Sequence, residues 1–208
     1  MIGAVILAAG AARRFGADKR LQPFGSSTVA VTTISKYCEI FDAVRLVVRK
    51  KDDPILHLVQ ELAQQLPQDF PLETIVAEDA HLGMGHSLSA GFQCLTWSYA
   101  FVALADMPLI QADTLRALKA LAMTQGSQII RPRHSRGGFG HPIGFPADLF
   151  TEVERCTGDQ GARQLLRDHA NSILECQIED EGLLADIDTP AALEAAVTAS
   201  KASVRPND

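Results

Sequence analysis

Short apolar runs alternate with longer helical patterns along nearly the whole chain, and this alternation constrains the fold more than any other feature. The runs predicted as strands are Ala4–Ala8, Ala43–Val48, Glu73–Val76, Ala100–Leu104, Gln128–Arg131, Ile173–Ile178 and Leu184–Ile187. The segments predicted as helices are Val29–Glu39, Pro54–Leu66, Ser87–Leu95, Ala112–Met123, Ala147–Arg155, Gly161–His169 and Pro190–Ala199. Alternation of this kind predicts an α/β fold whose mostly parallel sheet is covered by helices on both faces.

The length of the chain favours one domain. A chain of 208 residues is long enough to bury a sizeable core and short for two domains. We assign residues 1–199 to a single domain and expect residues 200–208, which are small and polar, to form a disordered tail. No segment reaches the ~18–20 consecutive apolar residues that a membrane-spanning helix needs.

Charge and cysteine usage narrow the class of protein. A formal net charge of −6 disfavours general binding to nucleic acid. The cysteines Cys38, Cys94, Cys156 and Cys176 lie far apart and form no Cys-x-x-Cys pair. Scattered free thiols are typical of a reducing compartment, and Ile2–Leu7 has the pattern of a strand rather than of a secretion signal. We therefore expect a cytoplasmic protein without nucleic-acid or membrane partners.

Charged side chains follow several of the predicted strands. In sheets of this type ligands bind at the carboxyl ends of the strands, so these side chains are expected to converge. They are Arg13, Arg14 and Lys19, which follow Gly10 after the first strand, Asp106 after the fourth, the basic segment Arg131–His141 after the fifth, and Asp186 and Asp188 at the last. Cations and carboxylates at one edge predict a pocket for a phosphate-rich ligand and a divalent metal.

The first loop lies in "VILAAGAARRFGADKRL" (Val5–Leu21), which fits neither common phosphate-binding motif. The dinucleotide motif Gly-x-Gly-x-x-Gly is missing between Gly10 and Gly16. A P-loop needs four residues between its glycines and then Lys-Ser/Thr, which this loop lacks. What remains is a longer loop whose backbone N–H groups and cations surround a triphosphate. A solvated basic loop is the alternative.

The loop is similar to the signature L-A-A/G-G-x-S-x-R-M-G-x-x-K of molybdopterin-type nucleotidyltransferases. Arg14, Gly16 and Lys19 match it. Ala12 stands where the signature has Ser, which removes a hydroxyl, and Phe15 replaces Met. Further blocks resemble, in order, those of the molybdenum cofactor cytidylyltransferases: "GMGHSLSAGF" (Gly83–Phe92), "ALADMPLI" (Ala103–Ile110), "GHPIGF" (Gly140–Phe145), "GDQGARQLL" (Gly158–Leu166) and "DIDTPAAL" (Asp186–Leu193).

The resemblance implies a Rossmann-like three-layer α/β/α sandwich of the nucleotidyltransferase type. It implies transfer of CMP from CTP to the terminal phosphate of the molybdenum cofactor (molybdopterin), with release of pyrophosphate. Mg²⁺ is the expected cofactor, since it prefers carboxylate oxygens and water. The product would pass to a recipient molybdoenzyme.

The site residues follow from the matched blocks together with their chemistry. The expected catalytic residues are Arg14, Lys19 and Asp106; the nucleotide-binding residues are Leu7, Ala8, Ala9, Gly10, Arg14, Lys19, Gly83 and Ser87; the metal ligands are Asp106 with Asp186 or Asp188; and the acceptor-binding residues are His141, Asp159 and Arg163. Helix capping is the alternative role for Asp106, Asp188 and Ser87. Helix-start electrostatics and surface exposure are the alternatives for Asp159 and Arg163.

Other functions stay open beside cytidylyl transfer. A guanylyltransferase or a sugar-phosphate nucleotidyltransferase belongs to the same superfamily, and a non-catalytic molybdenum cofactor carrier belongs to another class. Guanylyl relatives carry Leu-Ala-Gly-Gly where this chain has Leu7–Ala8–Ala9–Gly10, so the methyl group of Ala9 predicts CTP over GTP. Magnesium-dependent release of pyrophosphate separates an enzyme from a carrier.

Overall fold

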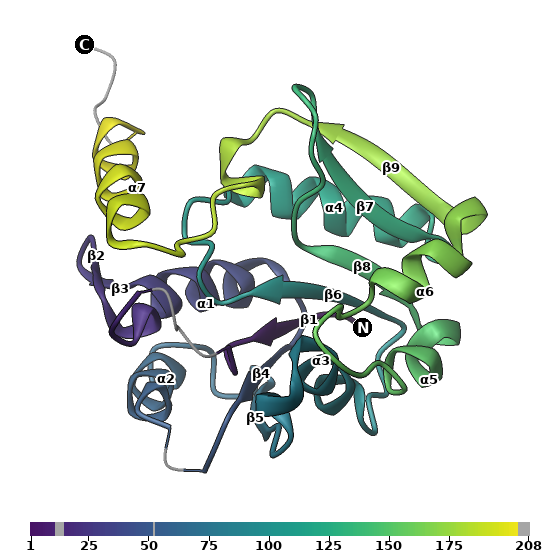
Figure 1. Ribbon diagram of the computed structural model, residues 1–208, viewed down its shortest axis with the longest axis horizontal. Coiled ribbons are helices and arrows are strands. Elements are labelled where there is room, and N and C mark those ends of the chain that lie inside the picture. Colours follow the sequence, from purple (N-terminus) through teal and green to yellow (C-terminus); the bar gives the residue numbers. More distant parts are fainter. Residues whose placement is uncertain (11–14, 52, 204–208) are drawn as a thin grey trace.

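A computed structural model describes residues 1–10, 15–51 and 53–203. Within these residues the chain forms a central seven-stranded sheet (Figure 1). The strands in spatial order are β5 (Leu72–Val76), β4 (Val44–Val48), β1 (Ile2–Leu7), β6 (Tyr99–Leu104), β8 (Ile143–Pro146), β7 (Ile129–His134) and β9 (Ile173–Ile178). Adjacent strands of the sheet pair in parallel, except that β8 is antiparallel to both of its neighbours, β6 and β7. The mostly parallel sheet is confirmed.

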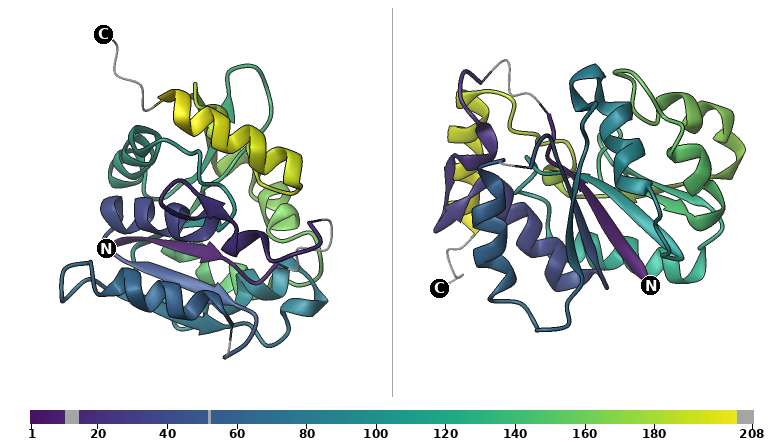
Figure 2. Two further views of the ribbon diagram at one scale, coloured as in Figure 1. Left: turned by 90° about the vertical axis from the view of Figure 1, so that its left-hand side faces the viewer. Right: turned by 90° about the horizontal axis from the view of Figure 1, so that it is seen from below.

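Side chains of the sheet alternate between two helical layers, as the two-residue period of a strand requires. Ile2, Ala4 and Ile6 of β1 point into a core that includes side chains of α1 (Val29–Ile40), α2 (Ile55–Ala63) and α4 (Ala112–Thr124). Val5 and Leu7 point to the other side. There they meet the layer of α3 (Met84–Phe92), α5 (Phe150–Val153) and α6 (Arg163–Asp168), as Figure 2 shows. The predicted three-layer α/β/α class is confirmed.

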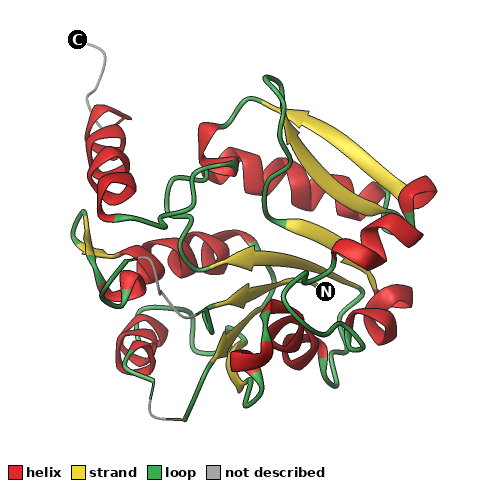
Figure 3. Cartoon of the chain, in the orientation of Figure 1, coloured by secondary structure: helices red, strands yellow, loops and turns green. Residues whose placement is uncertain are grey.

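A hairpin and the last helix form a smaller cluster outside the sheet (Figure 3). β2 (Pro23–Phe24) and β3 (Ser27–Thr28) pair antiparallel. Phe24 packs with Ile187 and with Ala196 of α7 (Pro190–Ser203). Because α7 continues to Ser203, it runs past the predicted start of a tail at residue 200, and residues 204–208 lie outside the described part of the chain.

Two strand predictions need correction. Residues 184–187 form a loop, not a strand, although Ile187 N–H donates to the Asp106 carbonyl at 3.0 Å. Conversely, β8 has no counterpart among the predicted strands because it is short and contains both glycine and proline. Its glycine is needed there, since a Cβ at Gly144 would lie 2.5 Å from the Tyr99 ring.

Two helix predictions also shift. α3 begins at Met84, earlier than the predicted Ser87. The predicted helix Ala147–Arg155 is a 3₁₀ turn, η3 (Ala147–Leu149), followed by the short α5. No helix within the described residues is long and apolar enough to cross a membrane.

The order of the strands places a crevice between β1 and β6. From β1 the chain proceeds outward through β4 to β5, and then returns to form β6 on the other side of β1. Loops that follow β1 and β6 therefore leave in opposite directions from adjacent strands. Such a switch point is where open α/β sheets bind ligands.

Candidate active site

A cavity of about 530 Å³ lies at the carboxyl ends of β1 and β6. It brings together most of the residues that the sequence singled out. Those that line it are Leu7, Ala8, Gly10, Lys19, Gly83, Ser87, Asp106, Asp159, Arg163, Asp186 and Asp188. They come from five separate segments of the chain, so the fold gathers the predicted nucleotide, metal and acceptor residues around one space.

Three predicted site residues are not among those that line the cavity. Ala9 is buried in the core beneath α3, between Ala8 and Gly10, which both line the cavity. His141 lies outside it, and burial lowers the pKa of His141 to about 4. Asp186 opposes this shift and Arg131 adds to it, so His141 is neutral at pH 7. Arg14 lies outside the described residues.

Lys19 links two of the predicted metal ligands. It begins η1 (Lys19–Leu21), and its ammonium group forms ion pairs with Asp106 and with Asp188, the latter at 2.6 Å. Burial opposes the charge of Lys19, but the two carboxylates outweigh it and raise the pKa of the ammonium group. A cation thus stands between a carboxylate that follows β6 and one that precedes α7.

The contacts of Asp188 and Ser87 argue against helix capping. At the start of α7 the Ala192 N–H is accepted by the Thr189 hydroxyl at 3.1 Å, whereas Asp188 points to Lys19. α3 begins after Gly83 without a side-chain cap, so Ser87 lies within the first turn and lines the cavity. These polar side chains are therefore directed at the cavity.

The carboxylates do not form a ready three-ligand metal site. Within the described ranges no group of three or more His, Cys, Asp or Glu side chains is close enough to hold a metal. Asp106 and Asp188 share Lys19, and Asp186 lines the cavity without contacting that ammonium group. Two hard oxygen donors fit a divalent cation that takes its other ligands from phosphate and water, as Mg²⁺ does.

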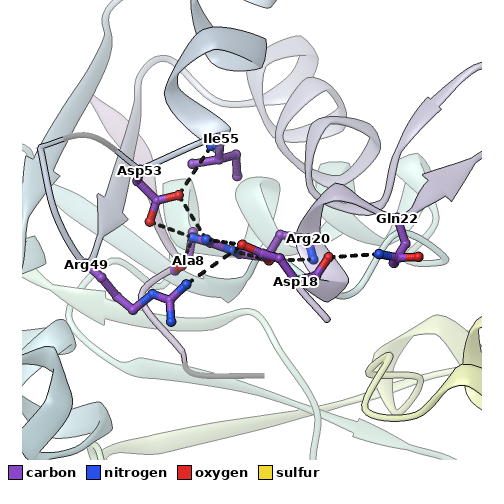
Figure 4. Close-up of polar contacts among 7 residues, drawn as sticks. All are labelled: Ala8, Asp18, Arg20, Gln22, Arg49, Asp53 and Ile55. Atoms are coloured by element: carbon purple, nitrogen blue, oxygen red, sulfur yellow. Dashed lines mark hydrogen bonds and ion pairs between the residues drawn. The ribbon is translucent and has the colours of Figure 1, made fainter. Parts of the chain in front are cut away.

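A buried arginine next to Lys19 holds η1 in place (Figure 4). Arg20 is only 3% exposed. Its guanidinium donates to Asp18 at 2.6 and 2.8 Å, to Asp53 at 2.9 and 3.1 Å, and to the carbonyl of Ala8. Burial opposes its charge, but the hydrogen bonds to the two carboxylates outweigh this and raise the pKa of Arg20.

This network ties three elements together. Ala8 follows β1 directly, Asp18 caps η1, and Asp53 accepts from the N–H of Ile55 at the start of α2 (Figure 4). The residues on both sides of Lys19 in the sequence, Asp18 and Arg20, are thereby fixed. Sequence reasoning missed Arg20, because its partner Asp53 is 33 residues away and nothing local marks the pair.

A second set of polar contacts fixes the loops that carry Asp106 and Asp188. Lys36 donates to the carbonyls of Pro108 and Ile110 at 2.6 and 2.9 Å, and burial lowers the pKa of this lysine. Asp180 accepts from Gln111 N–H and from the Thr114 hydroxyl at 2.9 and 2.7 Å. Both loops are therefore anchored to α1 and α4 rather than left in solvent.

Glycines bring Asp159 to the cavity. A Cβ at Gly83 or Gly85 would lie 2.4–2.5 Å from the backbone of Thr157 or Gly158. Gly83 also has a φ of 129°, a conformation that glycine alone adopts without strain. Gly85 N–H donates to the Gly158 carbonyl at 2.7 Å, so this donor of α3 is already used and does not face a ligand.

The basic segment that begins on β7 and continues into the following loop is partly neutralised by neighbouring carboxylates. Arg136 pairs with Glu181, and Arg133 lies 3.5 Å from Glu175. His134 is buried and accepts the Arg136 N–H at 3.1 Å. Arg131 differs from these, because its guanidinium stacks over the ring of Phe139 at 3.5 Å.

The fold and the cavity define a class of protein. A mostly parallel sheet with layered helices, and with cations and carboxylates at its switch point, is that of a Rossmann-like nucleotidyltransferase. The chain belongs to the family described as the MobA-like NTP transferase domain, which matches residues 4–173.

Three known proteins illustrate the similarity. The chain is 33% identical over 193 residues to the purine catabolism protein PucB of Bacillus subtilis, covering 89% of this chain and 91% of PucB. A crystal structure of Rv0371C from Mycobacterium tuberculosis in complex with manganese matches with a TM-score of 0.70 and 22% identity over 95% of this chain and 97% of that one. Molybdopterin-guanine dinucleotide biosynthesis protein A of Archaeoglobus fulgidus matches with a TM-score of 0.66 and 19% identity over 97% and 100%.

Proposed function

We propose that the protein transfers CMP from CTP to the terminal phosphate of molybdopterin, giving the cytosine dinucleotide form of the cofactor and pyrophosphate. The observation that carries the proposal is the position of Lys19 between Asp106 and Asp188 in the cavity at the β1–β6 crevice. Membership of the NTP transferase family supports nucleotidyl transfer as the reaction type.

The reaction requires no covalent intermediate with the protein. An oxygen of the acceptor phosphate forms a bond to the α-phosphorus, and the bond from that phosphorus to the β-phosphate oxygen breaks. The nucleophile is already an anion, so alignment and cancellation of negative charge are the main requirements. Lys19 supplies a cation beside the triphosphate, and the Arg20 network fixes η1, the element from which the Lys19 side chain extends.

Mg²⁺ would be held by Asp106 and Asp188, and when bound it would neutralise charge on the triphosphate. The pair is favoured over Asp106 with Asp186 because Lys19 already brings these two carboxylates to one point. The manganese complex of the similar protein Rv0371C supports a divalent cation at such a fold.

Support for CTP comes from the resemblance of the Leu7–Gly10 segment to cytidylyl relatives. Ala9 itself is buried beneath α3 and its methyl group does not line the cavity, so the proposal of CTP rests on the resemblance of this segment and not on a contact between the methyl group and the base. On the acceptor side, Asp159 and Arg163 line the cavity opposite the first loop. For the recipient, the similarity to a purine catabolism protein favours a molybdoenzyme that acts on purines.

The test is to incubate the purified protein with Mg²⁺, molybdopterin and each nucleoside triphosphate separately. We expect pyrophosphate release with CTP, and a cytosine dinucleotide product by mass spectrometry. Equal rates with GTP would overturn the base assignment. Binding of molybdopterin without pyrophosphate release from any triphosphate would identify a carrier instead.

A further inference from the structure

A second cavity, of about 460 Å³, adjoins the first and shares Arg163 with it. Three of the residues that line it are arginines: Arg131 on β7, and Arg163 and Arg167 on α6. Leu166 and Ile173 supply apolar walls, and Glu175 is its carboxylate. A cavity with three guanidinium groups stands out in a chain whose formal net charge is −6.

Arg131 has an unsatisfied donor at this cavity. Its Nε is buried and has no hydrogen-bond partner. The ring of Phe139 lies 3.5 Å from the guanidinium carbon and holds the group in one plane. A buried N–H without an acceptor costs free energy that a bound acceptor atom would recover. The guanidinium of Arg131 is thus held in one orientation at the cavity, with one N–H that no acceptor of the described residues satisfies.

The two arginines of α6 also carry charge that no carboxylate neutralises within the described part of the chain. Arg167 donates to the amide oxygens of Gln164 at 2.6 Å and Gln160 at 3.4 Å, which are neutral groups. The side chain of Arg163 has no hydrogen bond or ion pair among the described residues. Glu175, the acidic member of the wall, lies 3.5 Å from Arg133 and is also the neighbour of Arg131 across the β7–β9 pair, where it favours the charged form of that arginine.

We propose that this second cavity is an anion-binding subsite, which takes the oxygen-bearing molybdenum end of the acceptor, because the terminal phosphate of molybdopterin is its reacting group. Guanidinium forks match phosphate-like oxyanions in geometry and charge. Arg163, which lines both cavities, provides the connection along which one acceptor molecule extends from the β1–β6 crevice to the β7–α6 side. The inference that an anion binds here depends only on these contacts. The inference that this anion is part of the acceptor rests on the proposed function.

The first experiment uses inorganic phosphate as the probe and requires no catalysis. Arginine Nε–H resonances are followed by NMR during the titration, and the Arg131→Gln variant identifies the Arg131 signal. We expect this resonance to shift in wild type, and the apparent Kd for phosphate at this signal to rise about tenfold in Arg167→Gln. Arg167 is exposed on α6, so its replacement leaves the fold intact.

Two controls separate this subsite from the nucleotide cavity. Lys19→Ala removes a cation from the first cavity and is expected to leave the Arg131 titration unchanged. Arg116→Gln, which removes an exposed arginine of α4 paired with Asp113, is a matched surface control. An Arg131 resonance that does not respond to phosphate, or an unchanged Kd in Arg167→Gln, would overturn the subsite.

A second measurement identifies the source of the anion. If the acceptor supplies it, Arg167→Gln raises the KM for the acceptor about tenfold while kcat and the KM for the nucleotide stay the same. Phosphate binding that is lost in Arg167→Gln without any change in the acceptor KM would mean that free phosphate or pyrophosphate occupies the subsite, which contradicts the assignment. If no triphosphate supports transfer, the proposed function is overturned, but the phosphate titration still tests the anion-binding subsite.

Discussion

Lys19 and its carboxylates show how single charges are arranged at this site. The two carboxylates come from loops far apart in the sequence, and Asp106 is only 9% exposed. A buried carboxylate is costly unless a cation accompanies it. Lys19 supplies that cation in the absence of ligands, and we propose that the same ammonium group faces the triphosphate during transfer.

Replacing Lys19 by Ala should lower turnover by ~10²–10³-fold, because a pre-oriented cation beside the migrating phosphate charge is lost. Pyrophosphate release under saturating CTP and Mg²⁺ measures the effect. Lys119→Ala is a matched control, since Lys119 also forms an ion pair at 2.6 Å, with Asp42, but lies outside the cavity. Turnover near wild type in Lys19→Ala would remove this residue from the mechanism.

A second prediction about single residues concerns the carboxylates of the cavity. Asp106→Asn keeps size and shape but removes the charge, so it should melt near the wild-type temperature and lose magnesium-dependent transfer by ~10²–10³-fold. Asp188→Asn should behave alike. Asp186→Asn is the control, and we expect a loss below about tenfold because Asp186 does not contact Lys19. If Asp186→Asn were the more damaging change, the metal pair would have to be reassigned.

Among the elements, the Arg20 network joins the end of β1, η1 and the start of α2 through one guanidinium group. Removing one partner of a buried ion pair leaves an uncompensated charge, which typically costs about 3–5 kcal/mol. Arg20→Gln should therefore lower the free energy of unfolding by about that amount, as measured by urea denaturation. Arg20→Lys should recover part of it, because lysine keeps the charge but not the bidentate geometry.

The exposed Arg116–Asp113 ion pair of α4 is the control for the stability effect of the Arg20 network. Both side chains are exposed, so Arg116→Gln should change the unfolding free energy by at most about 1 kcal/mol. Similar effects of Arg20→Gln and Arg116→Gln would show that the first loop is held by other contacts. A fall in kcat in Arg20→Lys without a change in the KM for CTP would support a positioning role for Arg20.

At the scale of the whole molecule, stability should depend on pH through His141. Its pKa in the folded chain is lowered from 6.5 to about 4, mainly by burial, with Asp186 raising it and Arg131 lowering it. Between these pH values the unfolded chain binds a proton that the folded chain does not. The free energy of unfolding contributed by this residue therefore falls as the pH drops from about 6.5 to about 4, by at most ~3 kcal/mol.

His141→Gln tests this coupling, because glutamine stays neutral in both states. Urea denaturation at pH 7 and at pH 4.5 should show a smaller loss of stability on acidification in the variant than in wild type. Parallel pH profiles for the two proteins would contradict the lowered pKa of His141 in the folded chain.

Local patterns in the sequence determined the architecture of this protein and the edge of the sheet at which its charged side chains gather. Apolar periodicity marked six of the strands in the described sheet and the helices that cover it, because burial of a strand or a helix face imposes its own spacing on the chain. The positions of charged residues after these strands also indicated which edge of the sheet carries the site, since parallel strands end at the same edge.

Which charged side chains pair with each other was decided by the tertiary structure alone. The Lys19–Asp188 pair spans 169 residues and the Arg20–Asp53 pair spans 33, so neither has a local signal. β8 was missed because Gly144 and its proline neighbours lack strand propensity, yet Tyr99 packs where a side chain would otherwise stand. The last predicted strand, residues 184–187, instead became a loop that brings Asp186 and Asp188 to the cavity. Which distant groups meet depends on how the layers pack, and that is set by contacts over the whole chain rather than by the spacing within any segment.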